Sequence, residues 1–351
     1  MICASCKSSF TPFEKEKSFC EKFDVPPLDT CFECTQKQLL LFRNERAIYK
    51  RKCDATGAEF ISVYAPDKPY KVYRPDYWYG DQWDAMQYGQ PFDFNRTFFE
   101  QFAELQLKIP RLGMNNSKSE NSDYCNMTMG NKNCYLVFGG DFNEDCMYGT
   151  LNMRNKDVLD SYYADNNELC YWMYRSDNCY GSQFILNSKN CNNSAFISDC
   201  YGCSECILCT NLSQKSYCIE NIQYSKEEYS QKKQQLLNGS YGQQQENWEK
   251  LLDMRKNRIV KYANIAKSEN CTGDYIKNSK NVENSYDVIE SEDVFNSIFI
   301  INSKDVAASA LSGHNGTTLI FRSTSAVASY SVLASWWVAE SQNVQYSEMC
   351  F

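Results

Sequence analysis

Two pairs of cysteines near the start of the chain carry the clearest chemistry. Cys3 and Cys6 form one C-x2-C pair, and Cys31 and Cys34 form another. Two thiolates with this spacing wrap one metal ion, and two such pairs complete a tetrahedral four-thiolate site with no open position for a substrate. The spacing therefore predicts one structural Zn2+ site without catalysis. A redox pair and unpaired buried thiols are the alternatives, and the repetition of the pair favours metal.

The segment between the two pairs is slightly longer than the common spacing of about 15–20 residues. We expect a β-hairpin in this gap, with Pro26 and Pro27 in its connector, and therefore a zinc ribbon. Cys20 belongs to neither pair, so we expect it to be a small core residue.

A second group of cysteines, each three positions from the next, lies at Cys200, Cys203, Cys206 and Cys209. This run resembles part of an iron–sulfur motif, but its last spacing is shorter than in that motif and no proline follows. Two interpretations stay open: a second metal centre, or a row of inward-pointing thiols in a repeat. The departures from the motif favour the thiols.

The composition offers little material for other catalytic sites. The chain has nineteen Cys and one His, His314, so a Ser-His-Asp hydrolase or a two-His metal site would depend on that residue. We expect no catalytic residues and no enzyme activity. The alternative is a carbohydrate-active β-helix with catalytic carboxylates on one face, although the Asp and Glu side chains fall at repeat positions.

Length and patterning indicate a globular, cytoplasmic chain. The 351 residues correspond to about two domains. No apolar run reaches about 18 residues, so no membrane-spanning helix is expected, and the opening MICASCKSSF lacks the basic-then-apolar pattern of a secretory signal. In a reducing compartment the cysteines are expected to be thiols or metal ligands.

The net charge of −8 is unevenly distributed. Residues 1–116 are neutral, 117–224 carry −6, 225–267 carry +4 and 268–351 carry −6. Since acidic surfaces repel a phosphate backbone, any nucleic-acid contact is expected in the first or third segment.

A basic stretch from Gln36 to Lys52 has apolar residues at roughly helical spacing, which predicts an amphipathic helix. One interpretation is a helix that packs on the ribbon with a solvated basic side. The other is a nucleic-acid or ribosome contact through the basic residues of the stretch, which are Arg43, Arg46, Lys50, Arg51 and Lys52.

A short unit of two polar residues, then Asp or Asn, then Cys or Val, recurs after residue 117. It ends at Cys134, Cys146, Val158, Cys179, Cys191, Cys271, Val282, Val294 and Val306. Most neighbouring units are offset by twelve positions, and others by nine or eleven. Two steps, or about 21–24 residues, suit one coil of a parallel β-helix.

In such a β-solenoid the Cys and Val point inward, and Asn and Asp form stacked corners because they tolerate left-handed backbone. Helical repeats are the rival class, but Asn, Ser, Gly and Tyr are poor helix formers. The sequence therefore predicts a mainly β fold, a parallel β-helix interrupted by a helical hairpin.

Changes in composition divide the chain into five segments. Around Phe98–Ile109 and from Ser225 to about Leu237, helical signals are clear, and a further helix is expected from about Gln243 to Tyr262. The apolar end, residues 326–351, is expected to be a cap or an assembly surface. The segments are 1–52, a zinc ribbon with a basic helix; 53–116, an aromatic-rich α+β module; 117–224, the first part of the solenoid; 225–267, a helical insertion; and 268–351, the second part and its cap.

A resemblance to a known family is carried by six stretches of the chain: Phe42–Arg46, Lys52–Gly57, Pro66–Tyr73, Phe98–Phe102, Asn131–Leu136 and Tyr224–Tyr229. In these stretches the chain resembles an uncharacterised family of cytosolic proteins from candidate-phyla-radiation bacteria that joins a zinc ribbon to Cys/Asn-rich repeats. The family often has another C-x2-C before the position of Trp78, where this chain has Arg74 and Tyr77. A second ribbon at Cys53 is therefore not expected. The resemblance implies architecture and brings no activity.

These features favour a non-enzymatic structural or interaction protein, a zinc-stabilised scaffold that binds itself, as a homo-oligomer or filament, or binds another protein. A nucleic-acid or ribosome-associated zinc-ribbon protein is the alternative.

Overall fold

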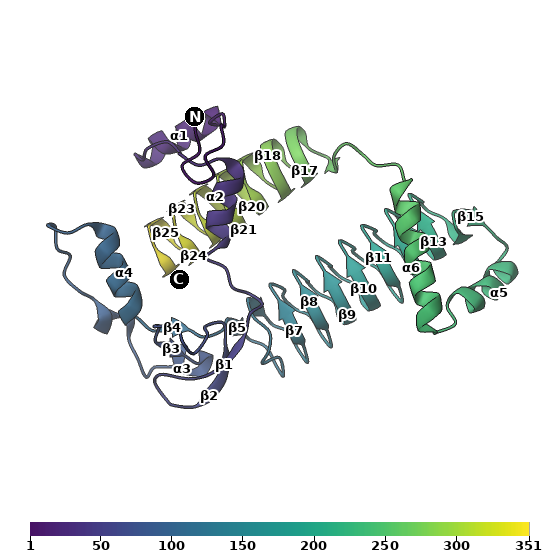
Figure 1. Cartoon of the computed structure of the whole chain (residues 1–351), viewed down its shortest axis with the longest axis horizontal. Helices are drawn as coiled ribbons and strands as arrows, with labels where there is room; N and C mark the ends of the chain where they lie inside the picture. The colour runs from purple at the N-terminus through teal and green to yellow at the C-terminus, as the bar shows by residue number, and fades with distance from the viewer. Residues whose placement is uncertain (351) are drawn as a thin grey trace. The chain divides into compact units, whose positions relative to one another are not determined.

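The computed structural model describes residues 1–350. The chain is mainly β, with 40% strand and 19% helix, and contains two large parallel sheets (Figure 1). It divides into two compact units. Unit 1 joins Met1–Asn44 to the chain from Val260 onward, and unit 2 is Glu45–Ile259. Each unit contains one of the large sheets, so each is described by itself.

Unit 2 contains a nine-stranded sheet in chain order. Every pairing is parallel except the last, which is antiparallel. In the register, Val158 lies opposite Cys170 and Ala195 opposite Ile207. The strands are β7 Tyr135–Phe138, β8 Met147–Thr150, β9 Lys156–Tyr162, β10 Glu168–Tyr174, β11 Gln183–Leu186, β12 Ala195–Ser198, β13 Ser204–Thr210, β14 Ser216–Ile219 and β15 Ile222–Gln223.

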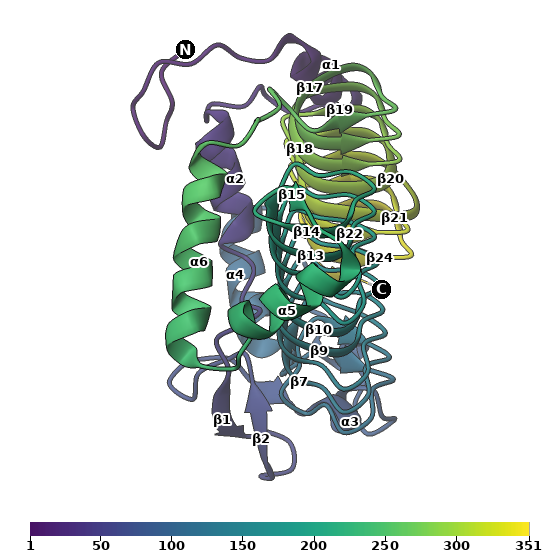
Figure 2. The same cartoon turned by 90° about the vertical axis from the view of Figure 1, so that its right-hand side faces the viewer.

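The larger sheet of unit 1 has eleven strands, all paired in parallel. Figure 2 shows the strands of this sheet as successive layers, with β17 near the top and β24 lower down. The strands are β16 Ile265–Ala266, β17 Glu269–Lys277, β18 Lys280–Ile289, β19 Glu292–Phe295, β20 Ile298–Ala307, β21 Ala310–Phe321, β22 Thr324–Val327, β23 Tyr330–Leu333, β24 Trp336–Ala339, β25 Gln342–Gln345 and β26 Glu348–Cys350.

A single 12-residue step stacks one strand on the next, since residues twelve positions apart lie opposite one another in most pairings. The expectation that two such steps separate stacked strands is therefore wrong. A step this short leaves room inside for very few side chains, which explains why the inward residues are small.

The backbone repeats every three residues within each step. From Asn133 to Glu220, every third residue has a positive φ, and up to Leu208 the residue that follows it is buried, as at Cys134, Cys170 and Cys191. Each 12-residue step in this range thus has four inward positions. The prediction that the repeat Cys and Val point inward is confirmed for the buried residues, whereas Cys271 is only half-buried.

The prediction of Asn and Asp corners is also confirmed. Asn133 and Asp145 have φ near +52° and +53°, and the Nδ2 of Asn133 donates to the Oδ1 of Asp145 at 3.0 Å. Sequence reasoning did not foresee that large side chains such as Tyr148, Trp172 and Leu208 also adopt left-handed backbone. Each costs about 1–2 kcal/mol, which the strand pairing on both sides offsets.

Inward polar residues form hydrogen-bonded ladders inside both sheets. In unit 2, Asn131, Asn143, Asn155 and Asn167 are stacked, each amide donating to the Oδ1 of the one before. In unit 1, serines take this role, as where the backbone N–H of Ser297 donates to the Oγ of Ser285 at 3.0 Å. These ladders satisfy groups that the narrow interior shields from water.

Helices α5 (Lys226–Leu236) and α6 (Tyr241–Lys256) cover an aromatic face of unit 2. A capping box at Ser225 and Glu228 starts α5, as the sequence predicts. Trp248 of α6 packs edge-on against Trp172, with ring centroids 4.5 Å apart, and Leu251 is fully buried. The second helix ends at Lys256, earlier than the expected Tyr262.

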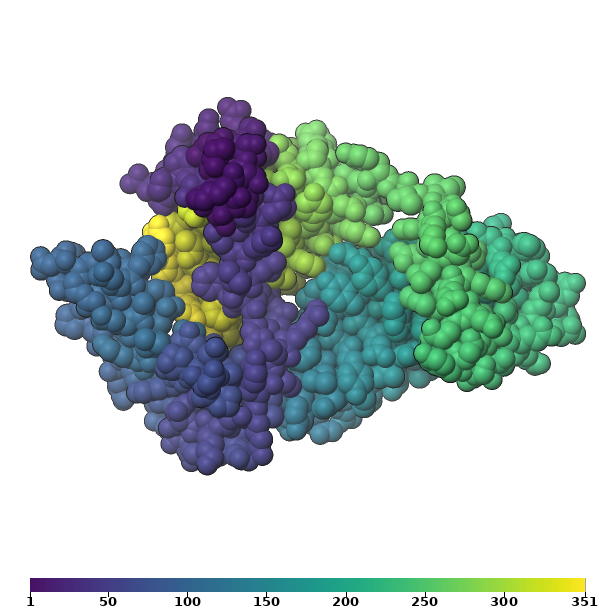
Figure 3. Space-filling model, in the orientation of Figure 1, coloured from purple at the N-terminus to yellow at the C-terminus, as the bar shows by residue number. Residues whose placement is uncertain are grey.

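Helices α1 (Glu14–Phe23) and α2 (Phe32–Leu40) belong to unit 1 and lie on its large sheet. Phe19 packs against Phe321 with ring centroids 5.7 Å apart, and Cys20 is buried in the same cluster, as expected of a small core residue. The space-filling view shows the N-terminal residues, in purple, against the green and yellow strands of unit 1 (Figure 3). The β-hairpin expected between the cysteine pairs is wrong, because α1 occupies that gap.

The start of unit 2 is a small α+β region. Its strands form short two-stranded sheets, and Trp78 and Trp83 pack together with ring centroids 4.4 Å apart. The helix expected at Phe98–Ile109 is present and ends one residue earlier. The elements are β1 Tyr49–Lys52, β2 Glu59–Ser62, β3 Val72–Tyr73, α3 Pro75–Trp78, the 3-10 helix η1 Ala85–Tyr88, α4 Phe98–Lys108, β4 Arg111–Leu112, β5 Asn116–Ser117 and β6 Thr128–Met129.

The apolar end of the chain continues the sheet of unit 1. Residues 324–350 form β22 to β26, paired at the same 12-residue offset. The cap expected over residues 326–351 is thus absent from the described part, and Phe351 lies outside it. Within residues 1–350, none of the helices combines the length and apolarity that crossing a membrane requires.

Candidate metal centre

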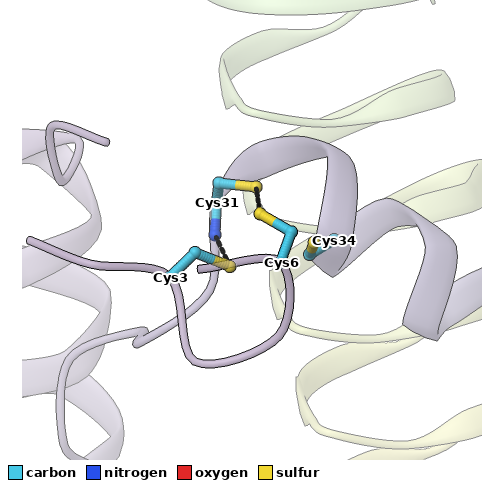
Figure 4. Close-up of side chains that lie close together, drawn as sticks. All are labelled: Cys3, Cys6, Cys31 and Cys34. Carbon is cyan, nitrogen blue, oxygen red and sulfur yellow. Dashed lines mark hydrogen bonds between the residues drawn. The ribbon is translucent and has the colours of Figure 1, made fainter. Parts of the chain in front are cut away.

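The four cysteines of the two N-terminal pairs lie together in unit 1. Their sulfur atoms are all within 4.8 Å of one another, and the Sγ atoms of Cys6 and Cys31 are 3.8 Å apart. Figure 4 shows the four side chains converging from the N-terminal loop and the start of α2. Cys3, Cys31 and Cys34 are buried and Cys6 is exposed. The sequence prediction that these residues form one cluster is confirmed.

The first cysteine pair sits in a tight turn. The backbone N–H of Lys7 donates to the carbonyl of Cys3 at 3.0 Å, and the N–H of Cys3 donates to the carbonyl of Ser8 at 2.9 Å. Lys7 has a φ of +64°, which lets the chain reverse within one turn. This geometry brings Cys3 and Cys6 to the same side.

The second pair is held by a helix start. Cys31 is the residue immediately before α2, and Cys34 lies in the first turn. The backbone N–H of Cys31 donates to the Sγ of Cys3 at 3.4 Å, and the hydroxyls of Thr30 and Thr35 are 2.8 Å apart. Backbone N–H groups at a helix start stabilise nearby thiolates, so the site favours ionised sulfur.

The thiols of the cluster differ in acidity. The pKa of Cys3 is lowered to about 6, mainly because the backbone N–H of Cys31 donates to its sulfur. The pKa of Cys31 is raised to about 12, since burial and the thiols of Cys34 and Cys6 outweigh the hydrogen bond from the backbone of Cys34. Cys3 thus gives up its proton more readily than Cys31, and a bound cation would displace the protons that remain on its ligands.

The donor set suits a tetrahedral ion. With metal–sulfur bonds of about 2.3 Å, the edge of a sulfur tetrahedron measures about 3.8 Å, equal to the 3.8 Å between the Sγ atoms of Cys6 and Cys31. Four thiolates fill such a shell completely, so no position remains for a substrate. These residues could bind a metal ion in a structural role.

The four cysteines from Cys200 to Cys209 occupy all four inward positions of one 12-residue step, and each is at most 2% exposed. Within residues 1–350, only the N-terminal group has three or more ligand atoms all within 4.8 Å of one another. The interpretation as inward thiols therefore describes their placement, and no ready-made tetrahedral centre is found at these positions.

The expected basic helix from Gln36 to Lys52 is wrong. Helix α2 ends at Leu40, and Tyr49–Lys52 is strand β1, paired antiparallel with β2. The tight turn at Cys53–Gly57 brings β2 alongside Tyr49–Lys52. The hydrogen bonds between the two strands stabilise this segment more than a helix would.

The five basic side chains of this stretch consequently do not share one face. Arg43 belongs to unit 1, and the other four belong to unit 2. Arg51 is 9% exposed, and its Nη2 donates to the carboxylate of Asp54 at 3.0 Å. Lys50 pairs with Glu59 at 2.8 Å. A nucleic-acid contact here would have to compete with these carboxylates.

The repeat carboxylates pair with lysines one step away. Glu144 pairs with Lys132 at 3.4 Å, and Glu292 with Lys304 at 3.2 Å. Sequence reasoning missed that some of these residues line an open groove in unit 1, which has a volume of about 1070 Å³ and includes Lys280 and Ser291. The 12-residue repeat in the sequence is the signal that could have placed these groove residues on neighbouring strands.

Comparison with known proteins adds no relative. No protein-family model matches the chain, and no curated protein matches it.

Proposed function

We propose that the chain is a non-enzymatic scaffold, a parallel β-solenoid with 12-residue coils, stabilised by one Zn2+ at Cys3, Cys6, Cys31 and Cys34, which binds further copies of itself through the end of unit 1. In-register pairing at an offset of twelve residues in most strand pairs supports the solenoid. The closed four-thiolate shell supports zinc in a structural role.

One observation carries the self-assembly. Within the described residues, β25 pairs only with β23, and β26 only with β24, so each has one edge on which these residues place no paired strand. Two inward rows run up to these edges, one from Val332 to Val344 and one from Val338 to Cys350. Free edges of parallel strands template the pairing of another chain, and a second copy would continue both the backbone ladder and the inward rows.

The oligomeric state tests this proposal. Light scattering after size exclusion of the reduced, zinc-loaded protein should show assemblies larger than one chain. Val344→Asp, which places a charge in one of these inward rows, should shift the protein to monomers, because an unpaired buried charge is costly. Asn343→Asp is the matched control, since Asn343 is exposed and has a φ of +54°, which Asp tolerates.

Two results would overturn self-assembly. One is a wild-type protein that remains monomeric at all concentrations. The other is an assembly that Val344→Asp leaves intact, which would place the contact away from this edge.

A further inference from the structure

A continuous cluster of buried thiols lies inside unit 2, apart from the N-terminal metal centre. The step from Cys200 to Cys209 supplies four sulfurs, and neighbouring steps add three more. We call this set the thiol cluster, and each member is at most 2% exposed. Its members are Cys179, Cys191, Cys200, Cys203, Cys206, Cys209 and Cys218.

The register stacks five of these cysteines in two rows, Cys179, Cys191 and Cys203 in one, and Cys206 and Cys218 in the other. Cys206 lies opposite Cys218 in the pairing of β13 with β14, and Cys203 follows Cys191 by one 12-residue step. Cys203 is the centre of the cluster, because Cys191 precedes it by one step and Cys200 and Cys206 occupy the inward positions on either side of it.

Hydrogen bonding alone does not account for the cysteines. The Sγ of Cys200 donates to the carbonyl of Ser198 at 3.4 Å, and that of Cys206 donates to the carbonyl of Ser204 at 3.5 Å. Serine makes the same bond at equivalent inward positions one step earlier, as where the Oγ of Ser188 donates to Leu186 at 2.8 Å. Serine can therefore replace cysteine in this hydrogen bond, and the fold does not require four thiols in one step. Their presence indicates a role that needs sulfur, such as binding a metal ion.

The spacing of the stacked sulfurs suits a two-coordinate ion. Paired strands lie about 4.8 Å apart. An ion between two thiolates, with bonds of about 2.3 Å as for zinc, places its sulfurs about 4.6 Å apart. A two-coordinate ion needs only neighbouring pairs of sulfurs, which the cluster offers repeatedly, whereas a tetrahedral ion needs a compact group of four.

We propose that the thiol cluster binds soft d10 ions of the Cu(I) class, each held between two neighbouring sulfurs. Thiolate ligands select Cu(I) over harder ions. Each ion forms two bonds to sulfur and displaces two thiol protons, leaving the pair with one negative charge.

The position of the cluster in the sheet supports uptake. The step from Cys200 to Cys209 is covered by one further step, in which Lys215 is exposed. The cluster therefore lies close to an end of the sheet, where an ion can enter.

The test is an anaerobic titration of the full-length, reduced, zinc-loaded protein with Cu(I) held by a competing chelator. Copper and zinc are measured together by elemental mass spectrometry after desalting, and thiolate-to-copper absorption is recorded. The wild type should bind at least two Cu(I) without losing zinc. The double variant Cys203→Ser/Cys206→Ser, which leaves Cys179 and Cys191 as the only stacked pair of the cluster, should bind at most one Cu(I) and keep its zinc.

Cys271→Ser is the matched control. Cys271 lies in unit 1, and the residue opposite it is Val282, so its removal should leave copper uptake unchanged. Equal copper uptake in the wild type and the double variant would overturn the proposal, as would copper binding matched by an equal loss of zinc.

Hydrogen exchange gives a measurement that does not depend on the folding of a variant. In the wild type, Cu(I) should slow exchange of amides in residues 200–218 and leave those of residues 280–340 unchanged. Unchanged exchange in residues 200–218 at saturating Cu(I) would contradict the proposed site.

Discussion

The inward side chains of the 12-residue step decide stability at the scale of single residues. The side chain at an inward position must be small, and it must form hydrogen bonds with the backbone groups around it. Asn143 does both: it is 1% exposed, its Nδ2 donates to the carbonyl of Asn152 at 2.9 Å, and its Oδ1 accepts from the backbone N–H of Asn155 at 3.1 Å. The recurrence of Asn, Ser and Cys at these positions has this common cause.

Asn143→Ala should lower the free energy of unfolding by about 2–4 kcal/mol, because it leaves several buried donors and acceptors unpaired at about 1–3 kcal/mol each. Asn192→Ala is the control, since Asn192 is exposed and outside the ladder; it should change stability by less than about 0.5 kcal/mol. Denaturant unfolding measures both. Equal effects of the two substitutions would show that the ladder is not stabilising.

At the scale of elements, glycines mark the places where the register departs from the 12-residue repeat. The pairing of β17 with β18 shifts at Cys271 and Gly273, and that of β20 with β21 shifts opposite Gly313. Gly313 has a φ of +140°, and a Cβ there would collide with the backbone carbonyl of Ile301. Other residues cannot adopt this conformation, so glycine permits the shift.

Gly313→Ala should therefore lower the free energy of unfolding by about 3 kcal/mol or more. Alanine disfavours this backbone conformation, and its Cβ would collide with the neighbouring strand. Gly242→Ala is the contrasting variant. Gly242 lies in α6 with no atom within 4 Å of its added Cβ, so alanine should stabilise the helix by about 1 kcal/mol. Thermal unfolding distinguishes them, and a stable Gly313→Ala variant would contradict the close approach of the two strands.

At the scale of the whole molecule, each unit covers an apolar face of its sheet with helices. In unit 2, α5 and α6 follow the sheet directly in the chain. In unit 1, α1 and α2 precede the sheet by more than two hundred residues. The four-cysteine cluster joins the start of the chain to the start of α2, so a bound metal would fix the fold of this distant segment.

Removal of metal should loosen unit 1 selectively. In Cys3→Ser/Cys6→Ser, or after chelation, amides of residues 14–40 should lose protection from hydrogen exchange, because structural zinc contributes about 10–16 kcal/mol of binding free energy that is lost with the site. Residues 156–219 of unit 2 should be unaffected. Ser5→Ala, in the same turn, is the control. Loss of protection in unit 2 as well would show that the metal stabilises both units.

The sequence by itself determined the repeating elements and the cluster of four N-terminal cysteines. The cysteine pairs, the inward Cys and Val, the Asn and Asp corners and the cap of α5 all follow from local spacing, because each depends on residues close together in the chain. Tertiary structure alone decided the rest. Tyr49–Lys52 pairs with β2, although its sequence has a helical pattern. The 12-residue length of the step depends on which strands stack. Helix α1 forms in place of a hairpin because Phe19 and Phe23 are buried against strands of unit 1, which lie too far away in the sequence for a local pattern to reveal the contact.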